Sequence, residues 1–140
     1  MILAWKMPVL RQMKIMIFSN DSKLLRLMQL AEMNDHITVT VLKDSQDPLD
    51  IMSAICSQNP SLVVLDDDFV EPHSAHVIRS VRKINSKVKF IFVTSDESVE
   101  LGREISPLGI HYYGHKPLAE SELHDSIESI IKLKTNISTT

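Results

Sequence analysis

The chain has 140 residues, a formal net charge of -3 at pH 7 and 24% charged residues. This length suits one domain with a single hydrophobic core, and the slightly acidic balance gives no electrostatic reason to expect nucleic-acid binding. A single cysteine, Cys56, cannot form an internal disulfide, which favours a reducing compartment such as the cytoplasm, and no apolar run approaches the roughly 20 residues that span a bilayer.

The first half of the chain alternates between segments typical of strands and of helices. Residues 14–18 are a short apolar run that predicts a buried strand, and the β-branched run 37–42 predicts a second one. A helix with one apolar face is expected between them. Asp47 and Pro48 predict the start of the next helix, whose buried stripe we expect to be Leu49, Met52, Ile55 and Cys56.

The second half repeats this alternation. Strands are predicted at 62–65, 88–94 and 110–113, with helices between them. Residues 119–134 predict a final amphipathic helix, followed by a polar tail. Five strands that alternate with helices indicate an α/β fold, in which a parallel sheet is covered on both faces.

Polar side chains of complementary chemistry follow several of these strands. Asp66 ends the third strand, Thr94 ends the fourth and Lys116 follows the fifth. Because ligands of open parallel sheets bind at the carboxyl ends of the strands, we expect these side chains to converge. A carboxylate, a hydroxyl and an ammonium group suit a phosphoryl group, with the carboxylate as nucleophile and a divalent cation to neutralise charge.

At these strand ends the chain resembles the receiver domains of two-component response regulators, of the chemotaxis-response-regulator type. The resemblance covers about residues 14–134 and rests on three segments: NPSLVVLD at 59–66, FIFVTS at 90–95 and GIHYYGHKP at 109–117. It implies a flavodoxin-like, doubly wound, five-stranded parallel sheet of order 2-1-3-4-5 with helices on both faces. Residues 1–13 would then be an N-terminal extension, and 135–140 a flexible C-terminal tail.

The resemblance also implies a role for individual residues. Asp66 would be the phosphoacceptor, Thr94 the switch hydroxyl, Lys116 the phosphate-binding lysine and Tyr113 the switch aromatic. The alternatives for the last three are an ordinary strand residue, an exposed lysine and a ring that packs on the sheet edge. Asp67 is expected to be a loop acid that faces water.

One departure from the family concerns its metal. Receiver domains normally end the first strand in two adjacent acids that bind Mg2+, whereas here Ser19 and Asn20 occupy those positions and Asp21 follows one place later. Asp21 could cap the first helix or bind the metal, and Asp68 could contribute to the site or face solvent. We therefore expect a weakened Mg2+ site, with these ligands: Asn20, Asp21, Asp66 and Asp68.

The function that the resemblance implies is phosphorelay signal transduction. A sensor histidine kinase or phosphotransfer protein would phosphorylate Asp66, and the domain, although no conventional enzyme, would help catalyse its own phosphorylation and dephosphorylation. An output protein or a second copy would bind the face formed by the fourth helix, fifth strand and fifth helix, with no direct contact with nucleic acid or membrane.

Two other functions stay open. One is a phosphorylation-independent pseudo-receiver that acts as a protein-interaction module, which the missing acidic pair favours. The other is a flavodoxin-like binder of a small phosphorylated ligand.

Overall fold

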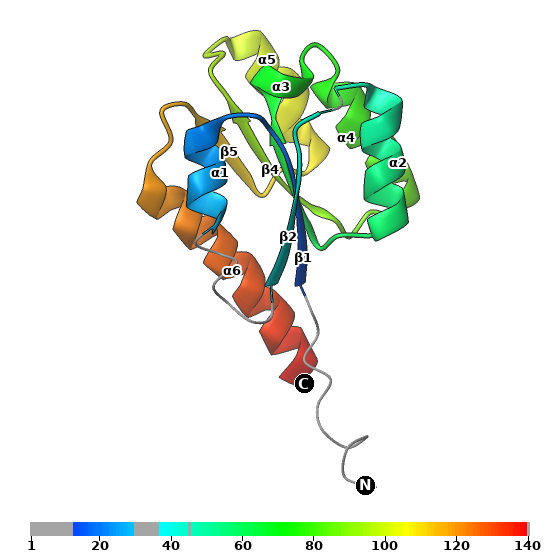
Figure 1. The fold of residues 1–140 in the computed structure, drawn as a ribbon, viewed down its shortest axis with the longest axis vertical. Helices are drawn as coiled ribbons and strands as arrows, with labels where there is room; N and C mark the ends of the chain where they lie inside the picture. The colour runs from blue at the N-terminus through cyan, green and yellow to red at the C-terminus, as the bar shows by residue number, and fades with distance from the viewer. Residues whose placement is uncertain (1–12, 30–36, 45, 140) are drawn as a thin grey trace, which may run out of the picture.

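The computed structural model describes residues 13–29, 37–44 and 46–139, with side chains as far as residue 132, so nearly all of the predicted extension 1–13 lies outside the described residues. Five parallel strands form one sheet in the order β2-β1-β3-β4-β5 (Figure 1), which confirms the predicted fold class and strand order. The strands are β1 (Met13–Phe18), β2 (Ile37–Leu42), β3 (Leu62–Asp66), β4 (Lys89–Thr94) and β5 (Tyr112–His115).

Helices cover both faces of this sheet. Helices α1 (Ser22–Gln29) and α6 (Glu120–Thr139) lie on one face, and α2 (Pro48–Gln58), α4 (Ser74–Ile84) and α5 (Val99–Ile105) lie on the other (Figure 1). The short helix α3 (Asp67–Val70) follows β3 directly, and a 3-10 turn, η3 (Ser106–Leu108), follows α5. None of the helices in the described ranges is long and apolar enough to cross a membrane.

The two faces of the sheet have separate hydrophobic cores, because successive side chains of a strand point to opposite sides. In β3, Leu62 and Val64 pack with α1 and α6, whereas Val63 and Leu65 pack with α2, α4 and α5. All five residues of β3 are buried. A strand buried on both faces is a rigid support, so the residue at its carboxyl end, Asp66, has a fixed position.

Several details of the helices differ from the sequence-based predictions. In α2 the predicted cap is confirmed, because the Asp47 side chain accepts from the Leu49 N–H. The predicted stripe is wrong at both of its ends, since Leu49 is 71% exposed and Cys56 is exposed, and the inward residues are Ile51 and Ile55. These two isoleucines are four positions apart, which places them on one helical face.

Two element boundaries also differ. Strand β5 covers Tyr112–His115, two residues later than predicted, so its carboxyl end brings Lys116 directly to the sheet edge. Helix α6 continues to Thr139, whereas the helix predicted from the sequence ends at residue 134.

Candidate functional site

Four strands deliver polar side chains to one edge of the sheet. The register pairs Phe18 of β1 with Leu65 of β3, and Thr94 of β4 with His115 of β5, so the residues after these strands are neighbours. The Lys116 N–H donates to the Thr94 carbonyl oxygen at 2.9 Å, which extends this ladder by one residue. The predicted convergence of polar groups at the strand ends is thus found.

Lys116 is the centre of this cluster. Its Nζ lies 2.8 Å from Oδ2 of Asp66, 2.9 Å from Oδ2 of Asp21 and 3.1 Å from Oδ2 of Asp68. Burial alone would lower the pKa of the Lys116 ammonium group, but the hydrogen bonds that it donates to these three carboxylates outweigh burial and raise the pKa above its ordinary value. Lys116 therefore stays charged, and it binds three acids from two segments, one after β1 and one at the end of β3.

Asp66 is the buried member of the cluster, with 1% of its surface exposed. Its Oδ2 accepts from the Ser19 hydroxyl at 2.6 Å and from Lys116, and its Oδ1 accepts from the Asp68 N–H at 3.1 Å. A buried carboxylate needs such donors, because an unpaired charge inside a protein is costly. The arrangement places Asp66 where the resemblance expects the phosphoacceptor.

The three residues after β1, which are Ser19, Asn20 and Asp21, have different contacts. Ser19 is buried and donates to Asp66, whereas the Asn20 side chain is exposed. Asp21 accepts from the N–H groups of Lys23 at 2.9 Å and Leu24 at 3.3 Å, and it also contacts Lys116. Both readings of Asp21 are therefore compatible with the structure, since it caps α1 and also lies in the cluster.

The pKa values of the two outer acids follow from Lys116. Burial would raise the pKa of Asp21, but hydrogen bonds from Lys116 and the Leu24 N–H hold it below its usual value. Burial would also raise the pKa of Asp68, but its bonds with Ser95 and Lys116 lower it. Both side chains are therefore anionic at neutral pH.

Asp67 does not face water, and the prediction for this residue is wrong. Only 3% of its surface is exposed, and its two oxygens accept from the Ser74 hydroxyl at 2.7 Å and the Thr94 hydroxyl at 3.0 Å. Burial raises the pKa of Asp67 despite these two bonds. Asp67 points inward because the chain enters helix α3 directly after Asp66, which turns the Asp67 side chain toward β4 and α4.

Thr94 and Tyr113 lie close to Asp67. The Thr94 hydroxyl donates to Asp67, and its oxygen accepts from the Asp96 N–H at 2.9 Å. The ring of Tyr113 packs on Phe92 with centroids 5.1 Å apart, and its hydroxyl is buried with no hydrogen-bond partner among the residues that the structure describes. Thr94 thus binds the second acid of the run, and no bond to Asp66 is recorded for it.

Sequence reasoning missed the hydroxyl groups that organise the acids. Ser95 donates to Oδ1 of Asp68 through its hydroxyl at 2.7 Å and its N–H at 3.3 Å. The hydroxyl of Ser19 donates to Asp66 and the hydroxyl of Ser74 donates to Asp67. Their position beside strand ends was a usable signal for Ser19 and Ser95, but Ser74 lies seven residues from its partner and only the fold brings it there.

The chemistry of the donor set fits a hard divalent cation. Asp21, Asp66 and Asp68 offer carboxylate oxygens around one ammonium group, so the cluster carries a formal excess of negative charge. A hollow of about 330 Å³ opens beside Lys116, lined also by Asp21, Leu24 and Pro117. The exposed Asn20 is the predicted ligand for which the structure records no contact with this cluster.

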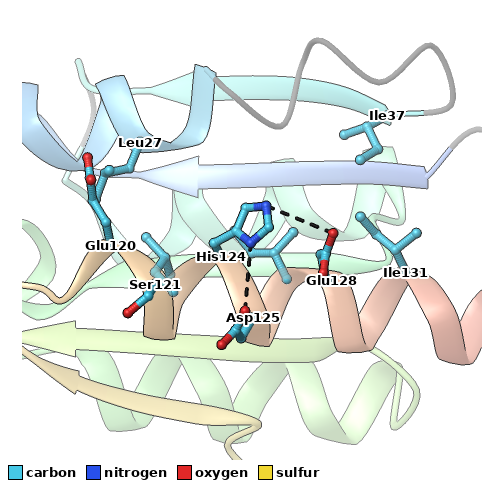
Figure 2. A pocket seen from close by; sticks show the side chains of 10 residues that line it. Leu27, Ile37, Glu120, Ser121, His124, Asp125, Glu128 and Ile131 are labelled. Atoms are coloured by element: carbon cyan, nitrogen blue, oxygen red, sulfur yellow. Dashed lines mark ion pairs between the residues drawn. The ribbon is translucent and has the colours of Figure 1, made fainter.

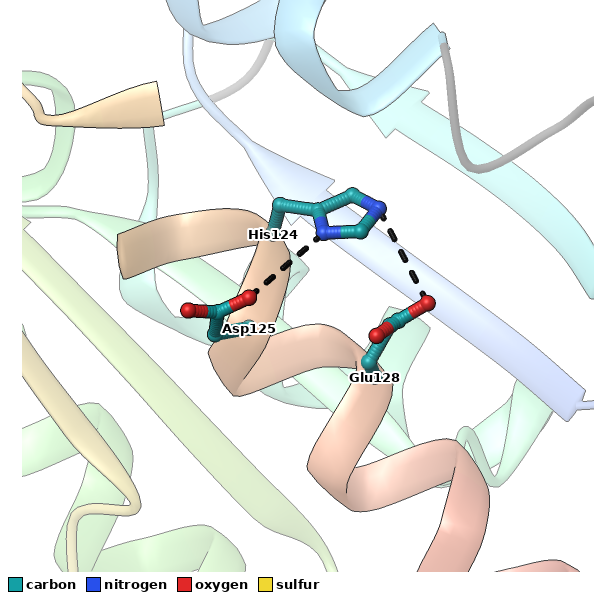
Figure 3. Close-up of side chains that lie close together, drawn as sticks. All are labelled: His124, Asp125 and Glu128. Atoms are coloured by element: carbon teal, nitrogen blue, oxygen red, sulfur yellow. Dashed lines mark ion pairs between the residues drawn. The ribbon is translucent and has the colours of Figure 1, made fainter. Parts of the chain in front are cut away.

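A second hollow lies away from these acids, between α1, the start of β2 and α6. It has a volume of about 510 Å³, and Figure 2 shows Leu27, Ile37 and Ile131 around it. On its rim His124 lies 3.8 Å from Asp125 and 3.9 Å from Glu128 (Figure 3). These three side chains are exposed, and ion pairs of this kind contribute little, so this rim resembles an ordinary charged helix surface.

Comparisons with known proteins place the fold. No protein-family model matches the chain, and neither does any curated protein. Solved structures do match: the signal receiver domain of an HD domain-containing protein from Pseudomonas fluorescens Pf-5 is 18% identical over 90% of this chain and 99% of its own, with a TM-score of 0.74. The chain has the receiver-domain fold.

Two further structures agree with this assignment of the fold. The signal receiver domain of a DNA-binding response regulator from Colwellia psychrerythraea 34H is 17% identical over 86% of this chain and 99% of its own, with a TM-score of 0.72. A CheY-like response regulator from Mesorhizobium loti is 19% identical over 86% of this chain and 99% of its own, with a TM-score of 0.65.

Within this receiver fold, the peptide bond between Lys116 and Pro117, which follows β5, is cis.

Proposed function

We propose that the protein is a response-regulator receiver that accepts a phosphoryl group on Asp66. The observation that carries this proposal is the contact between a buried carboxylate at the end of β3 and the Nζ of Lys116, 2.8 Å away, at the carboxyl edge of a receiver-type sheet. A carboxylate in this position can attack phosphorus, and the ammonium group can bind a phosphoryl oxygen as negative charge moves.

The transfer would proceed by in-line displacement. A carboxylate oxygen of Asp66 forms a bond to phosphorus while the bond from phosphorus to the donor breaks, and the donor leaves with the electron pair. Lys116 already binds Asp66 and therefore needs no large movement to reach the phosphoryl oxygens. The Asp21 and Asp68 carboxylates would hold Mg2+ together with Asp66, and that ion would supply neutralisation of the phosphoryl charge.

The partners of this reaction belong to the same proposal. A sensor histidine kinase or phosphotransfer protein would supply the phosphoryl group in the cytoplasm. An output protein or a second copy would bind the face expected from the sequence, because Tyr113 and Lys116 connect this face to the site. The fourth and fifth helices of that expectation are α5 and α6 in the structure, since the short helix α3 adds one to the numbering, and the strand is β5. Phosphorylation would shift an existing equilibrium between two conformations of that face.

One contact favours a second candidate function, a pseudo-receiver that binds protein partners without phosphorylation. Ser19 occupies a position at which receiver domains carry an acid, and its hydroxyl holds the very oxygen of Asp66 that contacts Lys116. If this hydrogen bond and the altered metal ligands prevent transfer, the domain would bind partners in one fixed conformation.

The test is the intact mass of the protein after incubation with acetyl phosphate and Mg2+. The proposal expects an increase equal to one phosphoryl group in the wild type and none in Asp66→Asn. Asp125→Asn is the matched control, because it removes an exposed acid of α6 that lies outside the cluster around Lys116, and it should form the same adduct as the wild type. An adduct that persists in Asp66→Asn would overturn the assignment, and no adduct in any variant would favour the pseudo-receiver.

A further inference from the structure

The single proton of the Thr94 hydroxyl already has an acceptor. It is donated to Oδ2 of Asp67 at 3.0 Å, while the hydroxyl oxygen accepts from the Asp96 N–H at 2.9 Å. A hydroxyl has one donor hydrogen. Phosphoryl oxygens on Asp66 are acceptors, so Thr94 can bind them through its hydroxyl only if it releases Asp67.

Asp67 holds this hydroxyl in a built site. The carboxylate is 3% exposed, and its other oxygen accepts from Ser74, which is itself 2% exposed and begins α4. Each of the two oxygens thus has one hydroxyl donor. Loss of either donor leaves a buried carboxylate oxygen without its partner, which is energetically costly.

We propose that Asp67 is a positioning residue that competes with a phosphoryl group on Asp66 for the Thr94 hydroxyl. This inference rests on the proposed function. In the unphosphorylated protein Asp67 holds Thr94 toward α4, and in the phosphorylated protein the phosphoryl oxygens draw it toward Lys116. Thr94 therefore has two alternative acceptors, and the strength of its bond to Asp67 sets how readily the site changes state.

Tyr113 offers a replacement donor for Asp67. Its hydroxyl oxygen is buried and has no hydrogen-bond partner in the part of the chain that the structure describes. Burial raises the pKa of Tyr113, and the negative charge of Asp67 raises it further, so the phenol keeps its proton and lies within the field of that carboxylate. When Thr94 leaves Asp67, a movement of this ring toward the carboxylate would give it a new partner.

The test is a double-mutant cycle read by beryllofluoride binding, since beryllofluoride with Mg2+ mimics a phosphoryl group on a carboxylate. The proteins are the wild type, Asp67→Ala, Thr94→Val and the double variant, and binding is followed by the backbone amide signals in NMR spectra. Removal of Asp67 frees the Thr94 hydroxyl, so Asp67→Ala is expected to bind beryllofluoride about tenfold more tightly, the effect of one charged hydrogen bond. In the Thr94→Val background the same change is expected to have no such effect.

Two controls separate this competition from a change in charge or in folding. Ser74→Ala removes the other hydroxyl from Asp67 but leaves the Thr94 bond, so its affinity is expected to stay near that of the wild type. Asp67→Asn keeps an oxygen acceptor and tightens binding by a smaller factor than Asp67→Ala, and it carries the test if the alanine variant does not fold. The amide signal of Asp96, which donates to Thr94, is expected to shift in unliganded Asp67→Ala toward its position in the wild-type complex.

The outcomes are distinct for the two proposals. Tighter binding of Asp67→Ala that persists in the Thr94→Val background would show a pure charge effect and overturn the competition, while the function of Asp66 would stand. Equal affinity of the wild type and Asp67→Ala would overturn it as well. A wild type that does not bind beryllofluoride would overturn the proposed function and the competition together.

Discussion

The Ser19 hydroxyl donates a 2.6 Å hydrogen bond to Oδ2 of Asp66, the same oxygen that accepts from Lys116. By resemblance an acid would stand at position 19. A neutral donor there gives the buried Asp66 carboxylate a partner, where a second carboxylate would repel it. The site is therefore stable without a cation, and its affinity for a cation is expected to be lower than with an acid at this position.

Ser19→Asp should make the site less stable without a cation and raise its affinity for Mg2+. In the presence of a chelator we expect a loss of about 1–3 kcal/mol in the free energy of unfolding, because a buried hydrogen bond is replaced by two adjacent like charges. Saturating Mg2+ should recover most of this loss, since binding to the native state alone stabilises it. Thermal unfolding with chelator and with Mg2+ measures both effects. Asn20→Asp is the matched control, and as an exposed residue it should change the melting temperature little in chelator.

Lys116→Met removes the common partner of three carboxylates. We expect a loss of about 2–3 kcal/mol in stability at neutral pH, because Asp66 is 1% exposed and loses its counter-ion. A second substitution, Asp66→Asn, should restore part of the loss by removing the unpaired charge. Urea denaturation of the single and double variants gives the coupling energy. Lys87→Met, at an exposed lysine, should be near neutral, and additive losses in the double variant would contradict this account.

Asp67 and Asp21 should have opposite effects on the pH dependence of stability. The pKa of Asp67 is raised above 3.8 in the folded protein, chiefly by burial, so the native state binds its proton more tightly than the unfolded state. Stability from this group is fully present below 3.8 and is lost as pH rises through the folded pKa. Asp67→Asn should therefore gain stability relative to the wild type as pH rises from about 4.

The pKa of Asp21 is lowered, although burial opposes this, because Lys116 and backbone N–H groups bind the anion. Its contribution is present above 3.8 and is lost as pH falls through the folded pKa, so Asp21→Asn should lose stability relative to the wild type as pH rises from about 2 to about 4. Urea denaturation in chelator at a series of pH values from about 2 to 7 measures both variants. Differences of equal sign for the two would contradict the assignment of these shifts.

Gly114 tests how tightly the strand before Lys116 is packed. A Cβ at this buried position would lie 2.8 Å from Cε2 of Tyr112 and 2.9 Å from Cδ2 of Leu118, so we expect Gly114→Ala to cost about 1–3 kcal/mol through overpacking. Gly102→Ala is the control, since a Cβ there would meet nothing within 4 Å beyond its chain neighbours and the backbone of its own helix, α5. That variant should gain about 0.5–1 kcal/mol from helix propensity. Chemical denaturation compares the two, and a neutral Gly114→Ala would show that the side chains around it can move.

The sequence by itself determined the architecture and the main residues of the site. Alternation of apolar runs with capped amphipathic helices leaves few topologies for a parallel sheet, and strand ends then bring Asp66 and Lys116 together. These inferences depend on local pattern and on backbone rules, so they need no knowledge of side-chain contacts. The same local pattern misplaced Leu49 and Cys56, because the face that a helix buries depends on how it packs on the sheet.

Only the tertiary structure decided how Asp67 and Asp68 differ. The sequence singles out Asp66 as the acid that ends the strand, but Asp67 and Asp68 have the same chemistry and adjacent positions, so no rule of composition or spacing separates those two. The start of a helix directly after Asp66 turns Asp67 inward to Ser74 and Thr94, and Asp68 outward to Ser95 and Lys116. The partners come from β4, α4 and the loop after β5, and contacts over such sequence separations exist only once the chain has folded.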